Sequence, residues 1–190
     1  MKRFSIYFRR SDIRRVIEWI RNRFRQQIWI GARSRISWSA QLRGLLWMGD
    51  DVEIGRGAIL SAHGGWIRLG NRVSINPYCV LYGHGGLEIG DNVRVAAGVI
   101  MVSANHRFDD ITRPIHVQGL TRKGIVIESD VWIGAGCLIL DGVRIGTGAV
   151  IGGGSVVIHD IPTRAVVVGN PAKIIRIRGQ QSELLATANS

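Results

Sequence analysis

The hydrophobic side chains between residues 127 and 158 recur with a strict period of six. A helix repeats every 3.6 residues and a flat strand every 2, so neither element explains this spacing. A parallel β-helix does explain it, because each group of six residues can form one short strand and one corner. Large aliphatic residues occupy one position of every group: Ile127, Ile133, Ile139, Ile145, Ile151 and Val157.

Two further positions of the repeat support this interpretation. Smaller side chains precede the last five aliphatic residues by two positions: Val131, Cys137, Val143, Ala149 and Ser155. Glycine follows four of them by three positions, where it can supply the positive φ of a corner: Gly136, Gly142, Gly148 and Gly154. The pattern therefore predicts an all-β solenoid that is stabilised by the stacking of its coils.

The same period continues more weakly from residue 54 to residue 101, with slips of two or three residues between blocks. The slips contain two similar sequences, His63-Gly64-Gly65 and His84-Gly85-Gly86. Three groups of six residues make one triangular coil of 18, so the separations of 21 (63 to 84) and 22 (84 to 106) equal one coil plus a bulge. This arithmetic predicts that His63, His84 and His106 lie above one another at one corner.

The repeat defines one predicted domain, residues 49–179 of the 190-residue chain. Residues 105–124 interrupt it without any period of six, and a connection of that length favours a functional loop. Residues 1–48 are predicted to form a basic N-terminal arm, a helix and a transition segment. Residues 180–190 are predicted to be a C-terminal tail.

Residues 12–29 have the spacing of an amphipathic helix, with apolar residues on one face and arginines on the other. The apolar face consists of Ile13, Val16, Ile17, Ile20, Phe24 and Ile28. The helix could pack against the end of the solenoid or a neighbouring subunit. Alternatively, residues 1–30 could be attracted to an anionic membrane or to an acidic lipid-linked substrate.

The positive charge of the chain is concentrated at its N-terminus. The net charge is +11, and residues 1–35 contribute +9 of it (11 basic minus 2 acidic residues). The remaining residues are nearly neutral, which argues against nucleic acid as a partner. Cys79 and Cys137 fall on inward positions, as expected of a reduced protein, and no secretory signal is visible. We therefore expect a cytoplasmic location, with peripheral contact at the inner face of the membrane.

His106 is the first candidate for chemistry, because it stands where the regular coils break into the 105–124 loop. An imidazole in this position can project into a cleft instead of the core. Histidine ordinarily has a pKa of about 6.5, so a neutral imidazole can remove a proton from a hydroxyl group near pH 7.

Several motifs resemble the hexapeptide-repeat acyltransferases, a family with a left-handed parallel β-helix. The resemblance covers residues 49–179 and is greatest to the sugar O-acetyltransferases of the galactoside, maltose and polysaccharide-modifying kinds. It is carried by Asp130-Val131-Trp132-Ile133-Gly134-Ala135-Gly136, Asp141-Gly142-Val143-Arg144-Ile145-Gly146, Gly152-Gly153-Gly154-Ser155-Val156-Val157, Asp160-Ile161-Pro162 and Gly169-Asn170-Pro171-Ala172-Lys173.

The resemblance implies a direct transfer of an acetyl group from acetyl-CoA to a sugar hydroxyl, with His106 as the general base. Asn76 matches a position whose amide holds an acceptor hydroxyl, although an asparagine that stabilises a corner turn would look the same. Tyr82, His84 and Asn105 are further candidates for acceptor binding. Related galactoside enzymes carry an acidic residue at the position of His84, so we expect a different acceptor here.

The resemblance also implies a set of residues that bind acetyl-CoA and no bound metal. Trp132 matches the position along the pantetheine arm, although a tryptophan packed outside a strand would look the same. The other donor candidates are Gly134, Ala135, Gly153, Lys173 and Arg176. A backbone N–H around Gly134–Ala135 is the candidate donor to the oxyanion. Ile158-His159 replaces a frequent Thr-Lys pair, which puts one phosphate contact in doubt. The resemblance further implies a homotrimer with the CoA cleft between two subunits.

Three other functions compete with this reading. N-acetylation of an amino sugar or a serine-type amine would favour carboxylates near His106, and Asp109 and Asp110 are available. Zinc hydrolysis of the γ-class carbonic anhydrase type needs two histidines five residues apart, whereas His106 and His116 are ten apart. A non-catalytic structural β-helix would not need His106, Trp132 and the basic tail together.

The preferred acceptors are precursors of exopolysaccharide, capsule or lipopolysaccharide O-antigen, because the arginine-rich arm could hold the protein near anionic lipid-linked saccharides.

Overall fold

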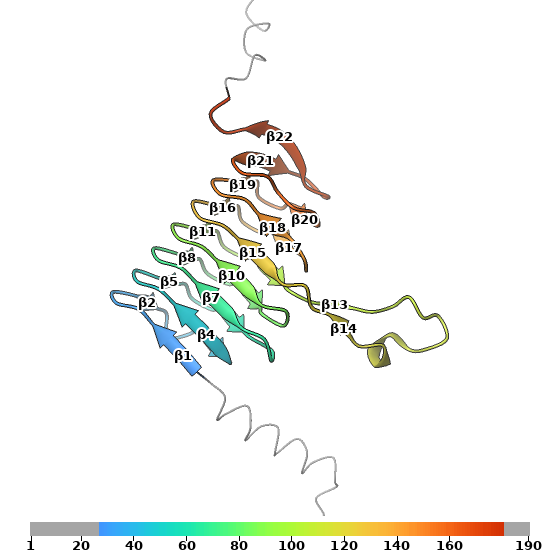
Figure 1. The fold of residues 1–190 in the computed structure, drawn as a ribbon. Coiled ribbons are helices and arrows are strands. Elements are labelled where there is room, and N and C mark those ends of the chain that lie inside the picture. Colours follow the sequence, from blue (N-terminus) through green and yellow to red (C-terminus); the bar gives the residue numbers. More distant parts are fainter. Residues whose placement is uncertain (1–26, 181–190) are drawn as a thin grey trace, which may run out of the picture.

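The computed structural model describes residues 27–180 as a solenoid of short strands with one projecting loop (Figure 1). The chain passes repeatedly through three parallel sheets, which we call faces 1, 2 and 3. Face 1 contains β1 (Gln27–Ile30), β4 (Leu45–Met48), β7 (Ile67–Leu69), β10 (Leu87–Ile89), β15 (Ile125–Ile127) and β18 (Arg144–Ile145). The predicted all-β parallel solenoid is thereby confirmed.

The other two faces complete a three-sided prism. Face 2 contains β2 (Arg35–Ile36), β5 (Glu53–Ile54), β8 (Ser74–Ile75), β11 (Arg94–Val95), β16 (Trp132–Ile133), β19 (Val150–Ile151), β21 (Ala165–Val168) and β22 (Lys173–Ile177). Face 3 contains β3 (Gln41–Arg43), β6 (Ile59–Ser61), β9 (Val80–Tyr82), β12 (Ile100–Val102), β17 (Leu138–Ile139) and β20 (Val156–Val157). The strands make six complete coils and the start of a seventh. The seventh begins at Ile161, which forms a parallel bridge with Ile145.

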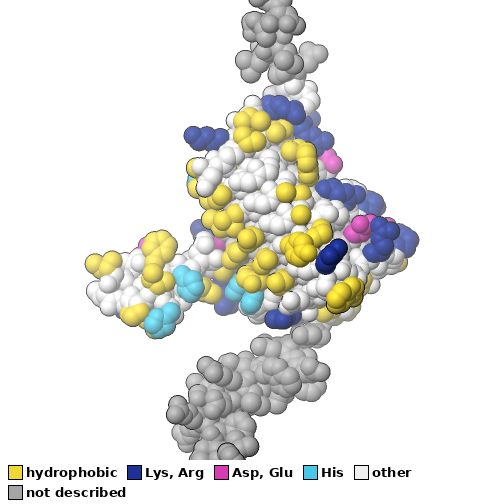
Figure 2. All heavy atoms as spheres, turned by 180° about the vertical axis from the view of Figure 1, so that it is seen from behind, with side chains coloured by type: hydrophobic (Ala, Val, Ile, Leu, Met, Phe, Trp, Pro, Cys, Tyr) yellow, Lys and Arg dark blue, Asp and Glu magenta, His cyan; other side chains and the backbone are white. Residues whose placement is uncertain are grey.

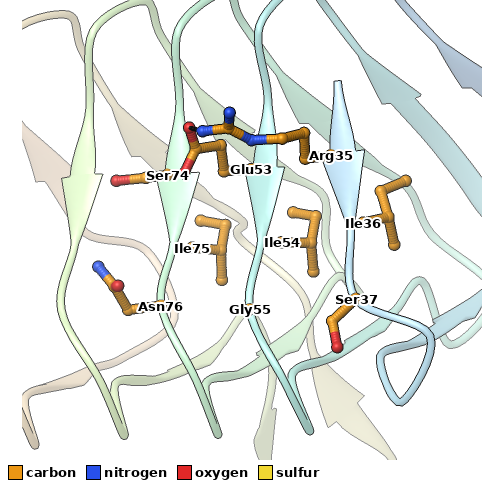
Figure 3. Close-up of a pocket in the computed structure, with 9 residues that line it drawn as sticks. All are labelled: Arg35, Ile36, Ser37, Glu53, Ile54, Gly55, Ser74, Ile75 and Asn76. Atoms are coloured by element: carbon orange, nitrogen blue, oxygen red, sulfur yellow. Dashed lines mark hydrogen bonds and ion pairs between the residues drawn. The ribbon is translucent and has the colours of Figure 1, made fainter. Parts of the chain in front are cut away.

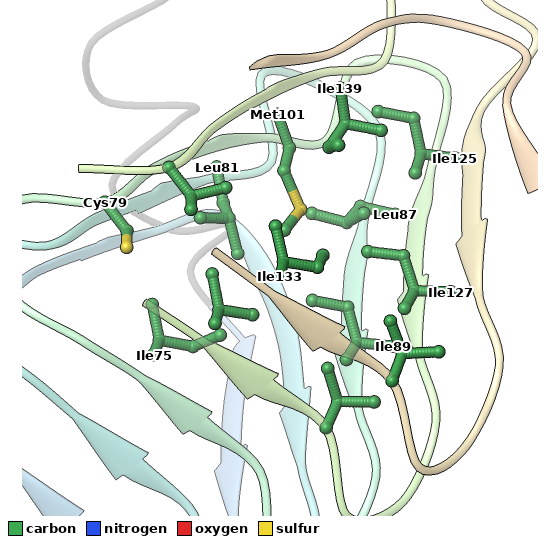
Figure 4. Packing of buried hydrophobic residues seen from close by; sticks show 14 of the residues in the cluster. Ile75, Cys79, Leu81, Leu87, Ile89, Met101, Ile125, Ile127, Ile133 and Ile139 are labelled. Atoms are coloured by element: carbon green, nitrogen blue, oxygen red, sulfur yellow. The ribbon is translucent and has the colours of Figure 1, made fainter. Parts of the chain in front are cut away.

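The core is a stack of aliphatic rows inside the prism (Figure 4). On face 2, Val95 pairs with Ile133 and Ile133 with Ile151, and each of these side chains is fully buried. Ile139 and Val157 repeat the arrangement on face 3. The six-residue period therefore marks the inward positions, as predicted. A row of like side chains one strand spacing apart forms a core that no single coil could bury alone.

Corners close in two ways. Glycine in the left-handed region supplies the turn at corners such as Gly136, with φ 68°. Elsewhere a ladder of short polar side chains stabilises the turn between faces 1 and 2, each accepting an N–H from the preceding coil. Asp50 accepts from Ala32, Asn71 from Asp50, and Asp91 from Asn71, at 2.6–2.9 Å.

The solenoid begins earlier than the predicted boundary at residue 49. Strand β1 pairs with β4, β2 with β5 and β3 with β6, so residues 27–44 form a complete first coil and residues 45–48 begin the second, instead of a transition segment. The 18-residue coil was present in the sequence as the pair Ile28 and Leu46, which occupy equivalent places on face 1. Polar residues and exposed tryptophans around these positions concealed it.

The predicted N-terminal helix is changed at its end. Residues 27–29, assigned to it from the sequence, belong to strand β1, while residues 12–26 lie outside the described part of the chain. Residues 181–190 of the predicted tail lie outside it as well. Within residues 27–180, no helix has both the length and the apolar composition required to cross a bilayer.

The predicted loop is an ordered arm between β12 and β15. It leaves and returns as an antiparallel pair, β13 (Asn105–His106) and β14 (Leu120–Thr121), and carries one 3₁₀ turn, η1 (Ile115–Val117). At its far end Gln118 Nε2 donates to the carbonyl oxygens of Asp110 and Arg113, both at 2.8 Å. The arm projects from the corner between faces 3 and 1 (Figure 1).

Candidate active site

His106 lies at the base of the arm, on strand β13. Its backbone position pairs with Leu120, and Asn105 pairs with Thr121. Both His106 and Asn105 are exposed, so the imidazole is free of the core as predicted. Asp141 fixes the returning strand, because its Oδ1 accepts from the backbone N–H groups of Lys123 and Gly124, each at 2.9 Å. This anchored end of the arm gives His106 a defined position.

The predicted column of three histidines is only partly correct. The imidazoles of His63 and His84 stack, with ring centroids 4.4 Å apart and planes 2° from parallel. His106 does not continue the column. Tyr82 is in register with Val102, so the residue equivalent to His84 in the next coil is Ala104. The spacing argument failed because this coil takes 20 residues (82 to 102), not 22, which places His106 two residues farther out on the arm.

Both histidines of the stacked pair have a lowered pKa, which favours their neutral forms. Burial, the neighbouring imidazole of His63 and the positive charge of Arg122 lower the pKa of His84, with burial the largest cause. Burial and then Arg43 lower the pKa of His63. Tyr82 packs edge-on against both rings, at 4.5 Å and 5.9 Å between centroids. Tyr82 and His84 thus lie together beside the base of the arm, as predicted.

Asn76 lies elsewhere, at the corner between faces 2 and 3. Its side-chain Nδ2 donates to the carbonyl of Val95 at 2.9 Å, so the amide stabilises the neighbouring coil. The residue borders a hollow of about 300 Å³ on face 2, where Arg35 lies against Glu53 and Ser74 stands on the next strand (Figure 3). Within one chain, Asn76 is therefore separated from Tyr82 and His84.

The candidate donor residues gather on face 2 and its corner with face 3. Trp132 is 56% exposed on β16, and the backbone register joins it through Val150 and Val166 to Arg176. Trp132 and Arg176 are thus in one row, separated by three strand spacings of about 4.8 Å, or roughly 14 Å. Lys173 stands on the same terminal strand, β22. The row offers an aromatic surface at one end and cations at the other.

The small residues of this corner have a packing reason of their own. A Cβ on Gly134 would meet the backbone N of Gly153 at 2.5 Å, so adjacent coils could not stack as closely. Gly154 N–H donates to the carbonyl of Ala135 at 2.8 Å, which ties the same two coils together. Ala135 and Gly153 are exposed, so a ligand could run along them.

A single chain keeps the candidate base apart from the candidate donor residues. His106 belongs to the corner between faces 3 and 1, whereas Trp132, Ala135 and Gly153 belong to face 2 and its corner with face 3. In a three-sided prism these two corners are the opposite borders of face 3 (Figure 1). No single-chain site can contain both sets.

Face 3 has an apolar outer surface, which the sequence reading missed. Five outward side chains in consecutive coils form one row: Ile59, Val80, Ile100, Leu138 and Val156. All are half-buried or exposed, with Ile100 at 40%, and Figure 2 shows hydrophobic side chains gathered on the solenoid body beside the arm. The corresponding rows of faces 1 and 2 contain charged residues such as Arg68, Glu88 and Glu53. Alternation along each strand, compared across coils, could have revealed the difference.

The two cysteines are core residues without a nucleophilic role. Cys79 and Cys137 are buried and unbridged, as predicted, and their thiols contact the carbonyls of Ala96 and Gly152. Burial raises the pKa of both thiols, which disfavours the reactive thiolate. Among residues 27–180, no three His, Cys, Asp or Glu side chains cluster closely enough to hold a metal ion.

Comparison with known proteins agrees with the fold and the repeat. Residues 124–159 match the family model described as bacterial transferase hexapeptide, six repeats. The repeat and the fold agree with this match.

Two curated relatives are enzymes by name. A protein of Mycobacterium tuberculosis named as a probable acetyltransferase is 37% identical over 131 residues, covering 69% of this chain and 44% of its own length. The 2,3,4,5-tetrahydropyridine-2,6-dicarboxylate N-acetyltransferase of Staphylococcus aureus is 38% identical over 98 residues, covering 52% of this chain and 35% of its own. The chain thus spans half or less of the length of these two relatives.

Among solved structures, a variant of AntD, an N-acyltransferase from Bacillus cereus, has a similar fold with a TM-score of 0.72. The two chains are 24% identical, and the match covers 90% of this chain and 94% of AntD. That structure contains dTDP-4-amino-4,6-dideoxyglucose and coenzyme A.

Proposed function

We propose that the protein is an acetyl-CoA-dependent acetyltransferase that modifies a sugar hydroxyl, with His106 as the general base. The match to the hexapeptide transferase model and the acetyltransferase names of similar proteins support acyl transfer. The observation that carries the proposal is the apolar face 3, which is bordered on one side by His106 and on the other by Ala135 and Gly153.

Association of identical copies through face 3 would bring these two borders together. In a closed ring around a threefold axis, the corner with His106 on one copy meets the corner with Ala135 and Gly153 on the next. The unpaired apolar row supplies a reason for association, since burying it removes hydrophobic surface from water. A homotrimer with three shared sites follows, and Asn76 of one copy then approaches His84 of its neighbour.

The reaction in such a site is a direct transfer. His106 removes the proton of the acceptor hydroxyl as the oxygen attacks the thioester carbonyl, and the tetrahedral intermediate then expels the CoA thiolate, which takes the proton from the imidazolium. The oxyanion needs a donor. The N–H groups of Gly134 and Gly136 donate to Ile151 and Ala97, whereas within residues 27–180 the N–H of Ala135 donates to no backbone carbonyl and is a candidate for that task.

Trp132 and the cations of β22 suit the donor. The indole would lie along the pantetheine arm. Lys173 and Arg176, at the other end of the row, would meet the phosphates of CoA. Their separation of roughly 14 Å along the sheet is compatible with an extended CoA molecule spanning several coils.

An amine acceptor is the second candidate. It is favoured by the N-acyltransferase names of the relatives. In the arm, Asp110 Oδ1 accepts from the hydroxyl and the N–H of Thr112, so Asp109 is the carboxylate better placed to bind an ammonium group.

A role at the membrane is part of the proposal. Polysaccharide precursors on the cytoplasmic side would be reached if residues 1–30 attach to anionic lipid. Since β1 begins at residue 27, a deletion that tests this attachment should end at residue 26.

The decisive experiment measures thiol release from acetyl-CoA with a panel of saccharides and amines. Replacing His106 with alanine should lower turnover by about 10²–10⁴-fold, since general-base assistance is lost. His116→Ala is the matched control, because His116 lies in the same arm on the exposed 3₁₀ turn. Equal rates for the His106 variant and the wild type would remove it from the mechanism, and turnover on amines alone would establish N-acetylation.

A further inference from the structure

Two stacked imidazoles beside the arm are unexplained by the transfer chemistry. His63 and His84 come from equivalent corners of successive coils, each followed by two glycines. Their rings are 4.4 Å apart and nearly parallel. A hydrophobic contact could be made by aliphatic residues, as in the inward rows of the solenoid.

The backbone at this corner is held in an uncommon conformation. His63 has φ 47°, in the left-handed region that non-glycine residues rarely adopt, and Gly64 follows with φ 86°. Seven other non-glycine residues of the described chain, among them Asp51 and Arg72, also have a positive φ, so the conformation is a regular feature of the corners. Here the conformation presents the His63 ring to that of His84.

The charges around the pair are positive. Arg43, from strand β3, acts on His63, and Arg122, which follows β14, acts on His84. The nearby carboxylate of Asp141 is engaged by the backbone N–H groups of Lys123 and Gly124. The Nδ1 atom of His84 is buried and has no hydrogen-bond partner within residues 27–180. Within residues 27–180, neither guanidinium group forms an ion pair with a carboxylate, and Arg43 donates to the side-chain oxygen of Gln41 at 2.7 Å.

The corner also contacts the segments where the chain enters and leaves the arm. Gly85 N–H donates to the hydroxyl of Ser103 at 3.1 Å, and a Cβ on Gly85 would lie 2.8 Å from the carbonyl carbon of Arg122. Ser103 precedes His106 by three residues on the outgoing side. A group bound at the histidine pair would thus stand next to the point from which His106 projects.

We propose that His63, His84, Arg43 and Arg122 form a binding site for a phosphoryl group of the acceptor. This inference rests on the proposed function, because it assigns a substrate class to that site: saccharides that carry a phosphate or diphosphate. Guanidinium groups and imidazolium N–H donors are well suited to phosphate oxygens. The dianion would compensate the mutual repulsion of the two rings, so both can become protonated when it binds.

A neutral saccharide is the competing occupant, since Tyr82 and the rings could pack against a sugar without any charge. The two possibilities differ in the protonation of the histidines. Phosphate binding raises the pKa of His63 and His84 from their lowered values, whereas a neutral sugar leaves both pKa values where they are.

The test follows the imidazole resonances of the full chain by NMR during pH titrations, without acetyl-CoA. Glucose 1-phosphate, inorganic phosphate and glucose are the probes. We expect the two phosphates to bind and to raise both pKa values, and glucose to do neither. Binding of glucose as tightly as glucose 1-phosphate, or unchanged pKa values with phosphate, would overturn the proposal.

Variants separate binding from folding. His84→Gln and Arg122→Gln should each weaken phosphate binding on the order of tenfold, as expected for the loss of one charge-assisted hydrogen bond. His116→Gln in the arm should bind as the wild type does. Equal binding by all three variants would refute the site, and the His63 resonance reports whether the corner is still folded.

The measurement also distinguishes this site from the transfer reaction. Phosphate binding without any thiol release would leave the site standing and reject the acetyltransferase. If acetyl transfer to neutral sugars is neither inhibited nor enhanced by added phosphate, the acetyltransferase would stand and the phosphoryl site would be rejected.

Discussion

The coils after residue 127 and the corner between faces 3 and 1 follow different rules. In the former, successive inward residues such as Ile133 and Ile151 are 18 positions apart, and the coil has no extra residues. In the latter, the chain inserts the bulges at His63 and His84 and the whole arm with His106. Regular coils supply a rigid support, and the candidate chemistry is concentrated where the chain departs from regularity.

The reason for this division lies in stacking. A side chain inside the prism must pack against those of the coils above and below, so each row takes apolar side chains of compatible size. A residue inserted at a corner points outward and disturbs no row. The corner can therefore carry histidines and arginines, while the interior cannot.

The largest effect on stability is expected inside the regular coils. Ile133→Ala should lower the free energy of unfolding by about 2–5 kcal/mol, because it leaves a cavity between the rows of two neighbouring coils. Ile133 is fully buried, whereas Ile100 points outward, so Ile100→Ala is the matched control and should cost much less. Denaturant unfolding measures both. Similar losses for the two variants would mean that face 3 is already packed like a core.

A smaller but selective effect is expected on face 3. Ile100→Lys places a charge in the middle of the apolar row and should weaken self-association at least about tenfold, since burying an unpaired charge is costly. Val126→Lys on face 1 is the control, because Val126 is likewise half-buried and faces outward. Sedimentation gives the mass and thiol release gives the activity. An Ile100→Lys protein that keeps both would exclude a site shared across face 3.

The smallest effect is the dependence of stability on pH at the irregular corner. Because the folded state lowers the pKa of His63 and His84 below that of unfolded histidine, the unfolded state binds protons more readily. The contribution is complete above the unfolded value near 6.5 and is lost as the pH falls through the lower folded values. Unfolding midpoints at pH 7.5 and 5.5 should differ less in a His63→Gln, His84→Gln variant than in the wild type. An identical decline in both proteins would show that the pair does not titrate in this range.

Much of the regular part was predictable from single residues. The period of six identified inward positions from residue 54 onward, the buried Cys79 and Cys137, and the corner role of Gly136. These features depend on local constraints, namely which side chain faces inward and where φ must be positive. The first coil was not predicted, because Ile28 and Ile36 lie among tryptophans and arginines. Only their pairing with Leu46 and Ile54, 18 residues later, identifies them as inward residues.

The sequence supplied candidate site residues but not their arrangement. His106, Tyr82 and Trp132 were identified from the sequence, yet counting 22 residues from His84 placed His106 in the wrong column. The size of each bulge decides which residues share a corner, and bulges are absorbed differently in each coil. The anchoring of the arm by Asp141 could not be read from the sequence either, because that carboxylate belongs to the next coil.

The sequence by itself determined that the chain coils and which side chains enter the core, because a repeat imposes the same local constraint at every turn, and it supplied the candidates for chemistry. Only the tertiary structure decided which of those residues meet. It separated His106 from Trp132 by the width of face 3, stacked His63 on His84, and aligned Ile59 through Val156 into one apolar row. Such neighbours come from the register between coils, which depends on the sum of all insertions along the chain and not on any one segment of it.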